Sequence, residues 1–314
     1  MLKVFKSYMQ SSDVISSLIA PDYQLYISAN LQAQQFQTIH AALAAHGLAV
    51  MDAQEVIGGW KLALIGNVKD MKQRNAELRL LSENLDVDIA LLEASPAPNL
   101  NKPGVLFMDM DSTLIQCECI DEIADFLGIK AQISAITQSA MEGKLDFSES
   151  LIARVKLLAG LDESVLNQVY EERIRLTDGA ERLINTVQSK GWKVGLVSGG
   201  FTFFTALLKE RLNLDFTSAN TLEIIDGKLT GRVLGNIVDA NSKRTLLIEK
   251  CAEWDIALQQ SVALGDGAND LPMLGVAGLG IAFHAKPKVR AAAPFALSHG
   301  GLDHTLHLLN DWKV

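Results

Sequence analysis

After residue 104 the chain alternates short, almost wholly apolar runs with segments of helical periodicity. Val105-Leu106-Phe107-Met108 is the first such run, and Lys193 to Val197 and Ser261 to Leu264 follow it. Helical spacing fills the stretches between them, including Gly179 to Lys190 and Lys243 to Trp254. Apolar strands separated by helices are typical of a parallel sheet covered on both faces. We therefore predict a doubly wound α/β sheet.

A long insertion separates the first of these strands from the next α/β element, at about residues 119–176. Helical periodicity dominates it, over residues 120–127, 129–141 and 148–158. Ligands of such sheets bind beyond the carboxyl ends of the strands, and an insertion of this length above that edge is typical of a cap. Farther along, Asp226-Gly227 stands between the strand patterns of residues 218–222 and 229–234, which predicts a hairpin.

Residues 22 to 95 have the pattern of a separate unit. Strands are expected over residues 23–28, 48–56, 60–65 and 87–92, and helices over residues 31–46 and 71–85. The order β-α-β-β-α-β is the ferredoxin-like arrangement. In element order it resembles the small ACT-like regulatory domains. The run Ala94-Ser95-Pro96-Ala97-Pro98-Asn99, ending at Pro103, predicts a linker. We expect two domains, residues 1–100 and 101–314, with the helical cap inside the second.

Charge and cysteine content narrow the class of protein. The net charge of −9 argues against a general nucleic-acid binder, which needs basic surface, but it leaves room for a local pocket for one small anion. Cys117, Cys119 and Cys251 lack the spacing of a disulfide framework, so we expect reduced, buried thiols. The first residues lack the apolar run of a signal peptide, and no stretch of about 18 apolar residues occurs. We expect no membrane span and a cytoplasmic location.

Four polar segments follow the predicted strands or begin the adjoining helices. They are Asp109-Met110-Asp111-Ser112-Thr113, Val197-Ser198-Gly199-Gly200, Lys243 after Asn241-Ser242, and Gly265-Asp266-Gly267-Ala268-Asn269-Asp270. Each alone has an ordinary explanation as a turn, a helix cap or a solvated lysine. Together they combine carboxylate oxygens that suit a divalent cation with a hydroxyl and backbone N–H groups that suit a phosphoryl oxygen. We expect them to meet at one edge of the sheet.

The order of these segments resembles the haloacid dehalogenase superfamily of phosphohydrolases over roughly residues 104–300. Within it, Glu118, Asp121-Glu122-Ile123-Ala124, Met141 to Phe147 and Arg154-Val155 make the chain similar to the phosphoserine phosphatases. The resemblance implies Mg²⁺-dependent hydrolysis of O-phosphoserine, the last step of serine biosynthesis, through a phospho-aspartyl intermediate.

The resemblance also implies a role for each site residue. Asp109 is the expected nucleophile and Asp111 the general acid and base. Mg²⁺ would be held by Asp109, Asp266 and the backbone carbonyl of Asp111. The remaining roles are support of the metal by Asn269 and Asp270, placement of the nucleophile by Thr113, and stabilisation of the phosphoryl oxygens by Ser198, Gly199 and Lys243.

Substrate selection is expected in the cap. Arg154 has a planar fork that suits a carboxylate, and Glu118 can pair with an ammonium group. Met141 and Phe147 are expected to exclude water, and Asn269 to contact the substrate from the core. Without the resemblance, Arg154 would be read as a solvated residue, and Met141 and Phe147 as core of the cap.

Other functions fit part of the pattern. Another small-metabolite phosphatase or a phosphotransferase of the same superfamily would keep the four segments and change the cap contacts. A phospho-acceptor switch would need neither Asp111 nor a large cap. The first 100 residues suit either a domain that binds a regulatory amino acid or a module that stabilises the chain or forms a homodimer. Nothing in the pattern separates L- from D-phosphoserine.

Overall fold

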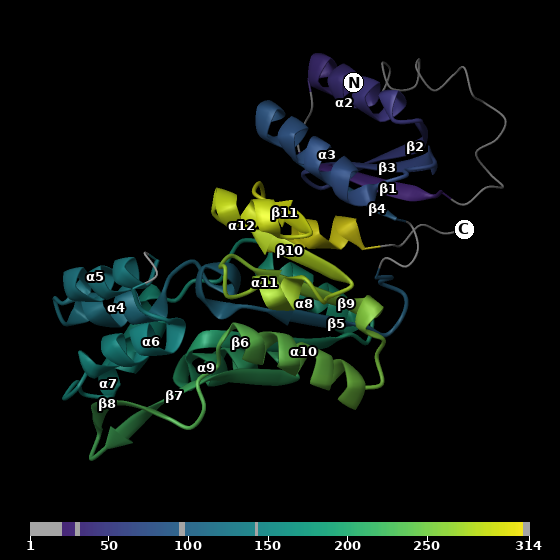
Figure 1. Cartoon of the computed structure of the whole chain (residues 1–314). Helices are drawn as coiled ribbons and strands as arrows, with labels where there is room; N and C mark the ends of the chain where they lie inside the picture. The colour runs from purple at the N-terminus through teal and green to yellow at the C-terminus, as the bar shows by residue number, and fades with distance from the viewer. Residues whose placement is uncertain (1–20, 29–31, 94–97, 142–143, 310–314) are drawn as a thin grey trace.

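The computed structural model describes residues 21–28, 32–93, 98–141 and 144–309. Their strands form two sheets, one of four strands in the order β2-β3-β1-β4 and one of seven in the order β11-β10-β9-β5-β6-β7-β8. Figure 1 shows the smaller sheet with its two helices at one end of the molecule and a group of helices, α4 to α7, projecting from the larger sheet.

The smaller sheet has the predicted element order. Its elements are β1 (Tyr23–Ser28), α2 (Ala33–Ala45), β2 (Leu48–Val56), β3 (Gly59–Gly66), α3 (Met71–Leu85) and β4 (Asp88–Glu93). All of its strand pairs are antiparallel, which confirms the ferredoxin-like, ACT-like arrangement. Asp70 caps α3 by accepting a hydrogen bond from the backbone N–H of Gln73, and Asp86 ends the helix in the left-handed conformation.

Strand β1 is buried on both faces. Leu25 and Ile27 pack toward the helices of this unit, whereas Tyr26 packs into the main core of the larger unit. The apolar and polar alternation of β1 predicts one face in water, yet Gln24 is only 2% exposed. The difference arises because the C-terminal helix η3 (Leu302–Leu308) covers the second face, where the Tyr26 hydroxyl lies 2.9 Å from Nδ1 of His304.

The larger sheet confirms the doubly wound prediction. Its strands are β5 (Val105–Met108), β6 (Lys193–Phe201), β7 (Phe216–Ile225), β8 (Lys228–Leu234), β9 (Ser261–Gly265), β10 (Leu279–Phe283) and β11 (Phe295–Leu297). All neighbouring pairs are parallel except β7 and β8. These two form the predicted hairpin, in which Asp226 (φ 51°) and Gly227 (φ 74°) make the two-residue turn.

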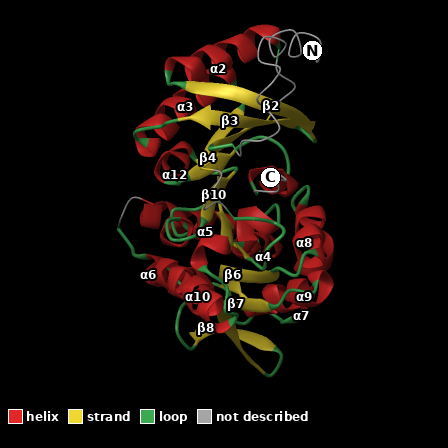
Figure 2. Cartoon of the chain, turned by 90° about the vertical axis from the view of Figure 1, so that its right-hand side faces the viewer, coloured by secondary structure: helices red, strands yellow, loops and turns green. Residues whose placement is uncertain are grey.

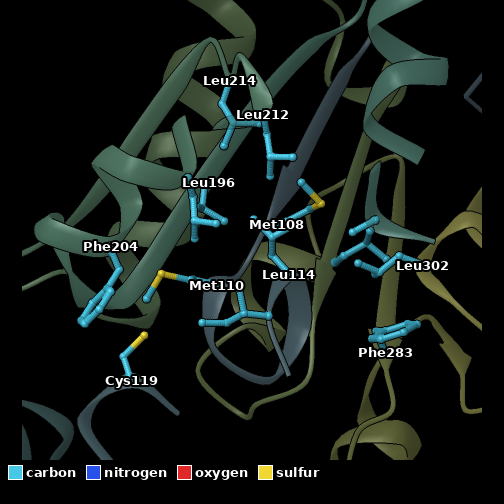
Figure 3. Packing of buried hydrophobic residues seen from close by; sticks show 14 of the residues in the cluster. Met108, Met110, Leu114, Cys119, Leu196, Phe204, Leu212, Leu214, Phe283 and Leu302 are labelled. Atoms are coloured by element: carbon cyan, nitrogen blue, oxygen red, sulfur yellow. The ribbon is translucent and has the colours of Figure 1, made fainter. Parts of the chain in front are cut away.

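Helices cover both faces of this sheet. One face packs against α8 (Ala180–Ser189), α9 (Thr202–Leu212) and η3, and the other against α10 (Ala240–Glu253), α11 (Leu271–Leu274) and α12 (Pro287–Ala292). Figure 2 shows α8 and α9 on one side of the strands and α10 and α12 on the other. The core on the face of α8, α9 and η3 is drawn in Figure 3, where Met108, Met110 and Leu114 lie between Leu196 and Leu302. Short helical turns occur at η1 (Met110–Leu114) and η2 (Leu258–Gln260).

The described residues of the cap insertion form four helices, of which the sequence predicts three. They are α4 (Cys119–Phe126), α5 (Lys130–Met141), α6 (Phe147–Lys156) and α7 (Ser164–Arg173). The turn between α6 and α7 pairs with the β7–β8 hairpin through backbone hydrogen bonds. The N–H of Gly160 donates to the Leu229 carbonyl at 2.8 Å, and the N–H of Leu229 donates to the Leu161 carbonyl at 2.8 Å. The N–H of Glu163 donates to the Gly227 carbonyl at 2.9 Å.

Two smaller predictions concern the cysteines and the membrane. All three cysteines are free, and Cys119 and Cys251 are buried as expected. The prediction of full burial is wrong for Cys117, which is partly exposed in the loop before α4. Within the described ranges, no helix combines the length and the apolar character needed to cross a bilayer.

Candidate active site

Three carboxylates meet at the carboxyl edge of the larger sheet. Asp109 directly follows β5, whereas Asp266 and Asp270 lie in the loop after the neighbouring strand β9. One oxygen from each of the three lies within 4.8 Å of the others. The expected convergence of Asp109 and Asp266 is therefore observed. Asp270 contributes the third carboxylate, a more central position than the supporting one expected from the sequence.

Lys243 is the cation of this cluster. Its Nζ lies 2.7 Å from Oδ2 of Asp109 and 2.7 Å from Oδ1 of Asp270, and its side chain is fully buried. Burial lowers the pKa of Lys243, but the two carboxylates raise it more, so the pKa lies above its usual range. Lys243 lies near the start of its helix as expected, although α10 begins three residues earlier than the predicted segment, at Ala240, with Asp239 as its N-cap.

The nucleophile expected from the sequence sits in a desolvated position. Oδ1 of Asp109 accepts the backbone N–H of Met110 at 2.7 Å, and the residue is 5% exposed. Burial, and after it the negative charge of Asp270, raises the pKa of Asp109 well above its usual range, while Lys243 opposes the shift. Three carboxylates face one ammonium group here, so a further cation would favour their ionised forms.

Asp111 has a different environment from Asp109, two residues away. Its Oδ1 accepts the backbone N–H of Cys119 at 2.9 Å, and its Oδ2 lies 3.5 Å from the hydroxyl oxygen of Ser198. Burial, and then the charge of Glu118, raises the pKa of Asp111 to about 7. A carboxyl with this pKa exchanges a proton readily near neutral pH. Its side chain lies outside the triad of oxygens, and binding of metal by its carbonyl stays a prediction.

The predicted phosphate-binding segment leaves the sheet at a bulge. Strand β6 pairs with β7 up to Val197 and again only at Phe201, so residues 198–200 lie outside the regular ladder. The Ser198 hydroxyl accepts the N–H of Gly200 at 2.8 Å. Phe147, the first residue of α6, covers the segment from the cap. A Cβ at Gly199 would lie 2.8 Å from the tip of the Phe147 ring, so a larger residue there would have to displace the ring.

The cap places two charged residues near Asp111. Glu118 immediately precedes α4, and its Oε1 accepts a hydrogen bond from the Ser112 hydroxyl at 2.7 Å. Arg154, on α6, donates from Nε to the Ser150 carbonyl at 3.3 Å. Burial lowers the pKa of Arg154, and the nearby Glu118 opposes this shift. The side chain of Met141, the last residue of α5, lies outside the described part of the structure.

The loop after β9 is shaped by its own polar side chains. Oδ2 of Asp270 accepts the N–H of Gly267 at 2.9 Å, and Thr113 donates from Oγ1 to Asp266 at 3.3 Å. Thr113 thus contacts a carboxylate of the triad and not Asp109, whose placement it was expected to help. Burial, followed by the charge of Asp270, raises the pKa of Asp266 to about 7. Asn269 is partly exposed on this loop, with its oxygen close to Gly267.

Comparisons with known proteins place this geometry in a family. The family model of haloacid dehalogenase-like hydrolases matches residues 106–275. A phosphoserine phosphatase from Polaromonas sp. is 49% identical over 221 residues, which cover 69% of this chain and 94% of that protein.

Two solved structures extend the likeness. A probable phosphoserine phosphatase from Vibrio cholerae, in its unliganded form, has a TM-score of 0.79 at 36% identity and covers 98% of this chain and 92% of its own. A structure described as a phospho-aspartyl intermediate analogue of phosphoserine phosphatase has a TM-score of 0.62 at 41% identity, covering 66% of this chain and 99% of its own.

Proposed function

Because the chain belongs to the haloacid dehalogenase-like hydrolase family, we propose that it hydrolyses O-phosphoserine to serine and phosphate through a phospho-aspartyl intermediate. The observation that carries the proposal is the pair of carboxyl groups with separated environments. Asp109 lies against Lys243, whereas Asp111 lies outside the triad, where burial and the charge of Glu118 raise its pKa to about 7. With a cation at the triad to favour the ionised form of Asp109, Asp109 can attack while Asp111 holds a proton.

In the first step an oxygen of Asp109 attacks phosphorus, and the bond from phosphorus to the serine oxygen breaks. Asp111 gives its proton to the departing serine oxygen. In the second step Asp111 takes a proton from a water molecule that attacks the same phosphorus, and the aspartyl oxygen leaves. Lys243, the Ser198 hydroxyl and backbone N–H groups near Gly199 stabilise charge on the phosphoryl oxygens.

The carboxylate triad fits a hard divalent cation such as Mg²⁺. Its donors are all oxygen atoms, and three negative charges face only one positive charge, that of Lys243. Asp109 and Asp266 would hold the ion together with the carbonyl of Asp111, and Asp270 would join or support them. When bound, the cation would neutralise charge on the phosphoryl group and on the carboxylates.

The cap supports the choice of substrate. Phosphoserine carries a carboxylate and an ammonium group beyond its phosphate, and Arg154 and Glu118 offer the complementary charges beside Asp111. Phe147 covers the phosphate-binding segment and excludes water. Met141, from the cap, and Asn269, from the loop after β9, are proposed to complete the substrate contacts.

A panel of phosphate esters tests the proposal. Phosphate release is measured with L-phosphoserine, D-phosphoserine, phosphothreonine and an aryl phosphate, each with Mg²⁺ and with a chelator. We expect phosphoserine to have a higher kcat/KM than the other esters and the chelator to remove activity, and comparison of the L- and D-forms measures the stereochemical preference. A higher kcat/KM for phosphothreonine or the aryl phosphate would indicate that the protein is a different small-metabolite phosphatase. Transfer of phosphate to an added alcohol in place of water would assign a phosphotransferase, and phosphorylation without turnover would assign a switch.

Three wider proposals accompany this function. We propose domains of residues 1–100 and 101–314, with the cap at about 119–176, supported by the separate hydrophobic core of the smaller sheet. The homodimer through the N-terminal domain stays a prediction that light scattering can test. The cytoplasmic location also stays a prediction.

A further inference from the structure

Asn220 joins two segments of the site that are far apart in the chain. Its Nδ2 donates to the Gly199 carbonyl at 2.8 Å, and its Oδ1 accepts the backbone N–H of Val238 at 2.8 Å. It lies on β7, in neither of the strands that carry the reacting carboxylates, and no sequence motif marks it. The residue is 1% exposed, so it is out of reach of a substrate.

The bond to Gly199 acts where the sheet does not hold the chain. Between Val197 and Phe201, β6 has three residues facing a single residue of β7, so the backbone there lacks the regular ladder. The side-chain amide of Asn220 replaces a ladder donor for the Gly199 carbonyl. Loss of the donor to this partly buried carbonyl would cost free energy, so the bond restricts the orientation of the Gly199 peptide.

The bond to Val238 holds the backbone just before α10, the helix that carries Lys243. Val238 immediately precedes Asp239, which caps α10 by accepting the N–H of Ser242 at 2.8 Å. The Asp239 carbonyl also accepts the backbone N–H of Lys243 at 3.0 Å. A fixed Val238 therefore fixes the first turn of α10 and, with it, the position from which Lys243 reaches Asp109.

We propose that Asn220 is a positioning residue that sets the distance between the phosphate-binding segment at Gly199 and the helix of Lys243. It does so by holding both backbones with one amide group. The inference rests on the proposed function, in which these two segments bind the same phosphoryl group. The rate of phosphoryl transfer falls steeply when one of several groups that bind the phosphoryl oxygens is displaced.

Two substitutions separate the bonds. Asn220→Asp keeps an acceptor for the Val238 N–H but removes the N–H that the Gly199 carbonyl needs. Asn220→Ala removes both bonds without adding a charge. We expect each to lower kcat on phosphoserine by about 10- to 100-fold. Both should also weaken the binding of inorganic phosphate, measured by calorimetry in saturating Mg²⁺, by about 10-fold. The Mg²⁺ concentration that gives half-maximal activity should not change, because Asn220 does not touch the carboxylate triad.

Ser261→Ala is the matched control. Ser261 is equally buried and also bridges two backbones, since its Oγ donates to the Leu258 carbonyl at 2.6 Å and accepts the Gly278 N–H at 3.2 Å. It begins β9, at the end of the sheet away from the site. We expect this variant to lower the unfolding temperature and to leave kcat and phosphate binding unchanged.

The outcomes distinguish the two proposals. Wild-type protein that binds phosphate without hydrolysing phosphoserine would overturn the proposed function, and the phosphate affinities would still test Asn220. Folded Asn220 variants with wild-type kcat and phosphate affinity would overturn the positioning role. Equal losses in Ser261→Ala, or failure of both Asn220 variants to fold, would overturn it as well, since either result assigns Asn220 to the stability of the sheet.

Discussion

Nζ of Lys243 lies 2.7 Å from Oδ2 of Asp109, and the lysine side chain is closed to solvent. The ammonium group balances one negative charge, yet Asp266 and Asp270 add two more carboxylates to the same cluster. Without a bound cation, these like charges would lie close together in a poorly solvated place, an arrangement that costs free energy of folding.

This excess charge leads to a prediction for Asp109→Asn. The substitution removes the nucleophile, so hydrolysis of phosphoserine should be abolished. It also removes one carboxylate, so the unfolding temperature in a chelator should equal or exceed that of the wild type. The increase in unfolding temperature on adding Mg²⁺ should shrink. Substantial residual turnover would contradict the nucleophile assignment, and an unchanged response to Mg²⁺ would contradict the assignment of Asp109 to the metal site.

The loss of rate on removing the proposed general acid should depend on the leaving group of the ester. With Asp111→Asn, we expect kcat on phosphoserine to fall by about 10²- to 10⁴-fold, because the serine oxygen is a poor leaving group without a proton. The first step with an aryl phosphate should be affected far less, since a phenolate leaves unprotonated. Rapid-mixing measurements of phenolate release would show this difference. Equal slowing of the first step with both esters would show that Asp111 does not protonate the leaving group.

Arg154→Ala should lower kcat/KM for phosphoserine much more than kcat/KM for an ester that lacks the serine carboxylate. We expect kcat/KM for phosphoserine to fall by about 100-fold, the loss expected for a charge-assisted contact, while an aryl phosphate changes by less than about threefold. Arg173→Ala is the matched control. Arg173 also belongs to a cap helix, but it pairs with Asp125 and Glu122 on the surface. Equal losses on both esters would show that Arg154 does not bind the substrate carboxylate.

The free energy of unfolding should depend on pH through His307, which lies on η3 and stacks on Tyr26 of β1. Burial lowers the pKa of His307 from 6.5 to about 4, and His304 adds to the shift. The unfolded chain therefore binds a proton at higher pH than the folded chain, so stability is full above about pH 6.5 and falls as the pH drops toward 4.

Chemical denaturation of His307→Gln and wild type measures this effect. Between about pH 7.5 and about pH 5.5, the wild type should lose up to about 1 kcal/mol more than the variant, allowing for the partial exposure of the ring. Parallel pH dependence in the two proteins would contradict the assignment.

Much of the fold follows from local patterns. The element order of the smaller sheet, the strands β5 and β9 and the hairpin at Asp226-Gly227 each rest on residues close in sequence. Strands β10 and β11 and helix α7 were not predicted. Leu279 to Phe283 contains a glycine, and Phe295 to Leu297 has only three residues, so neither gives a clear periodic signal.

The site was predictable in its residues and less so in its contacts. Family motifs identified Asp109, Asp266 and Lys243, because such motifs are built from the side chains that are expected to carry the chemistry. Asp270 as a third carboxylate and Asn220 as a bridge depend on how distant segments pack, and no spacing records that. The burial of Gln24 has the same origin, since η3 arrives from the other end of the chain to cover it.

The pairing of the β7–β8 hairpin with the turn between α6 and α7 makes the cap a tethered body. A movement of the cap that keeps the hydrogen bonds of Gly160, Leu229 and Glu163 holds this turn against the hairpin, so the turn would act as one pivot. Helix α6 runs directly into the pivot, so Arg154 would travel a short path while more distant parts of the cap swing farther. Arg154, the proposed contact for the substrate carboxylate, would then stay close to the core as the cap moves.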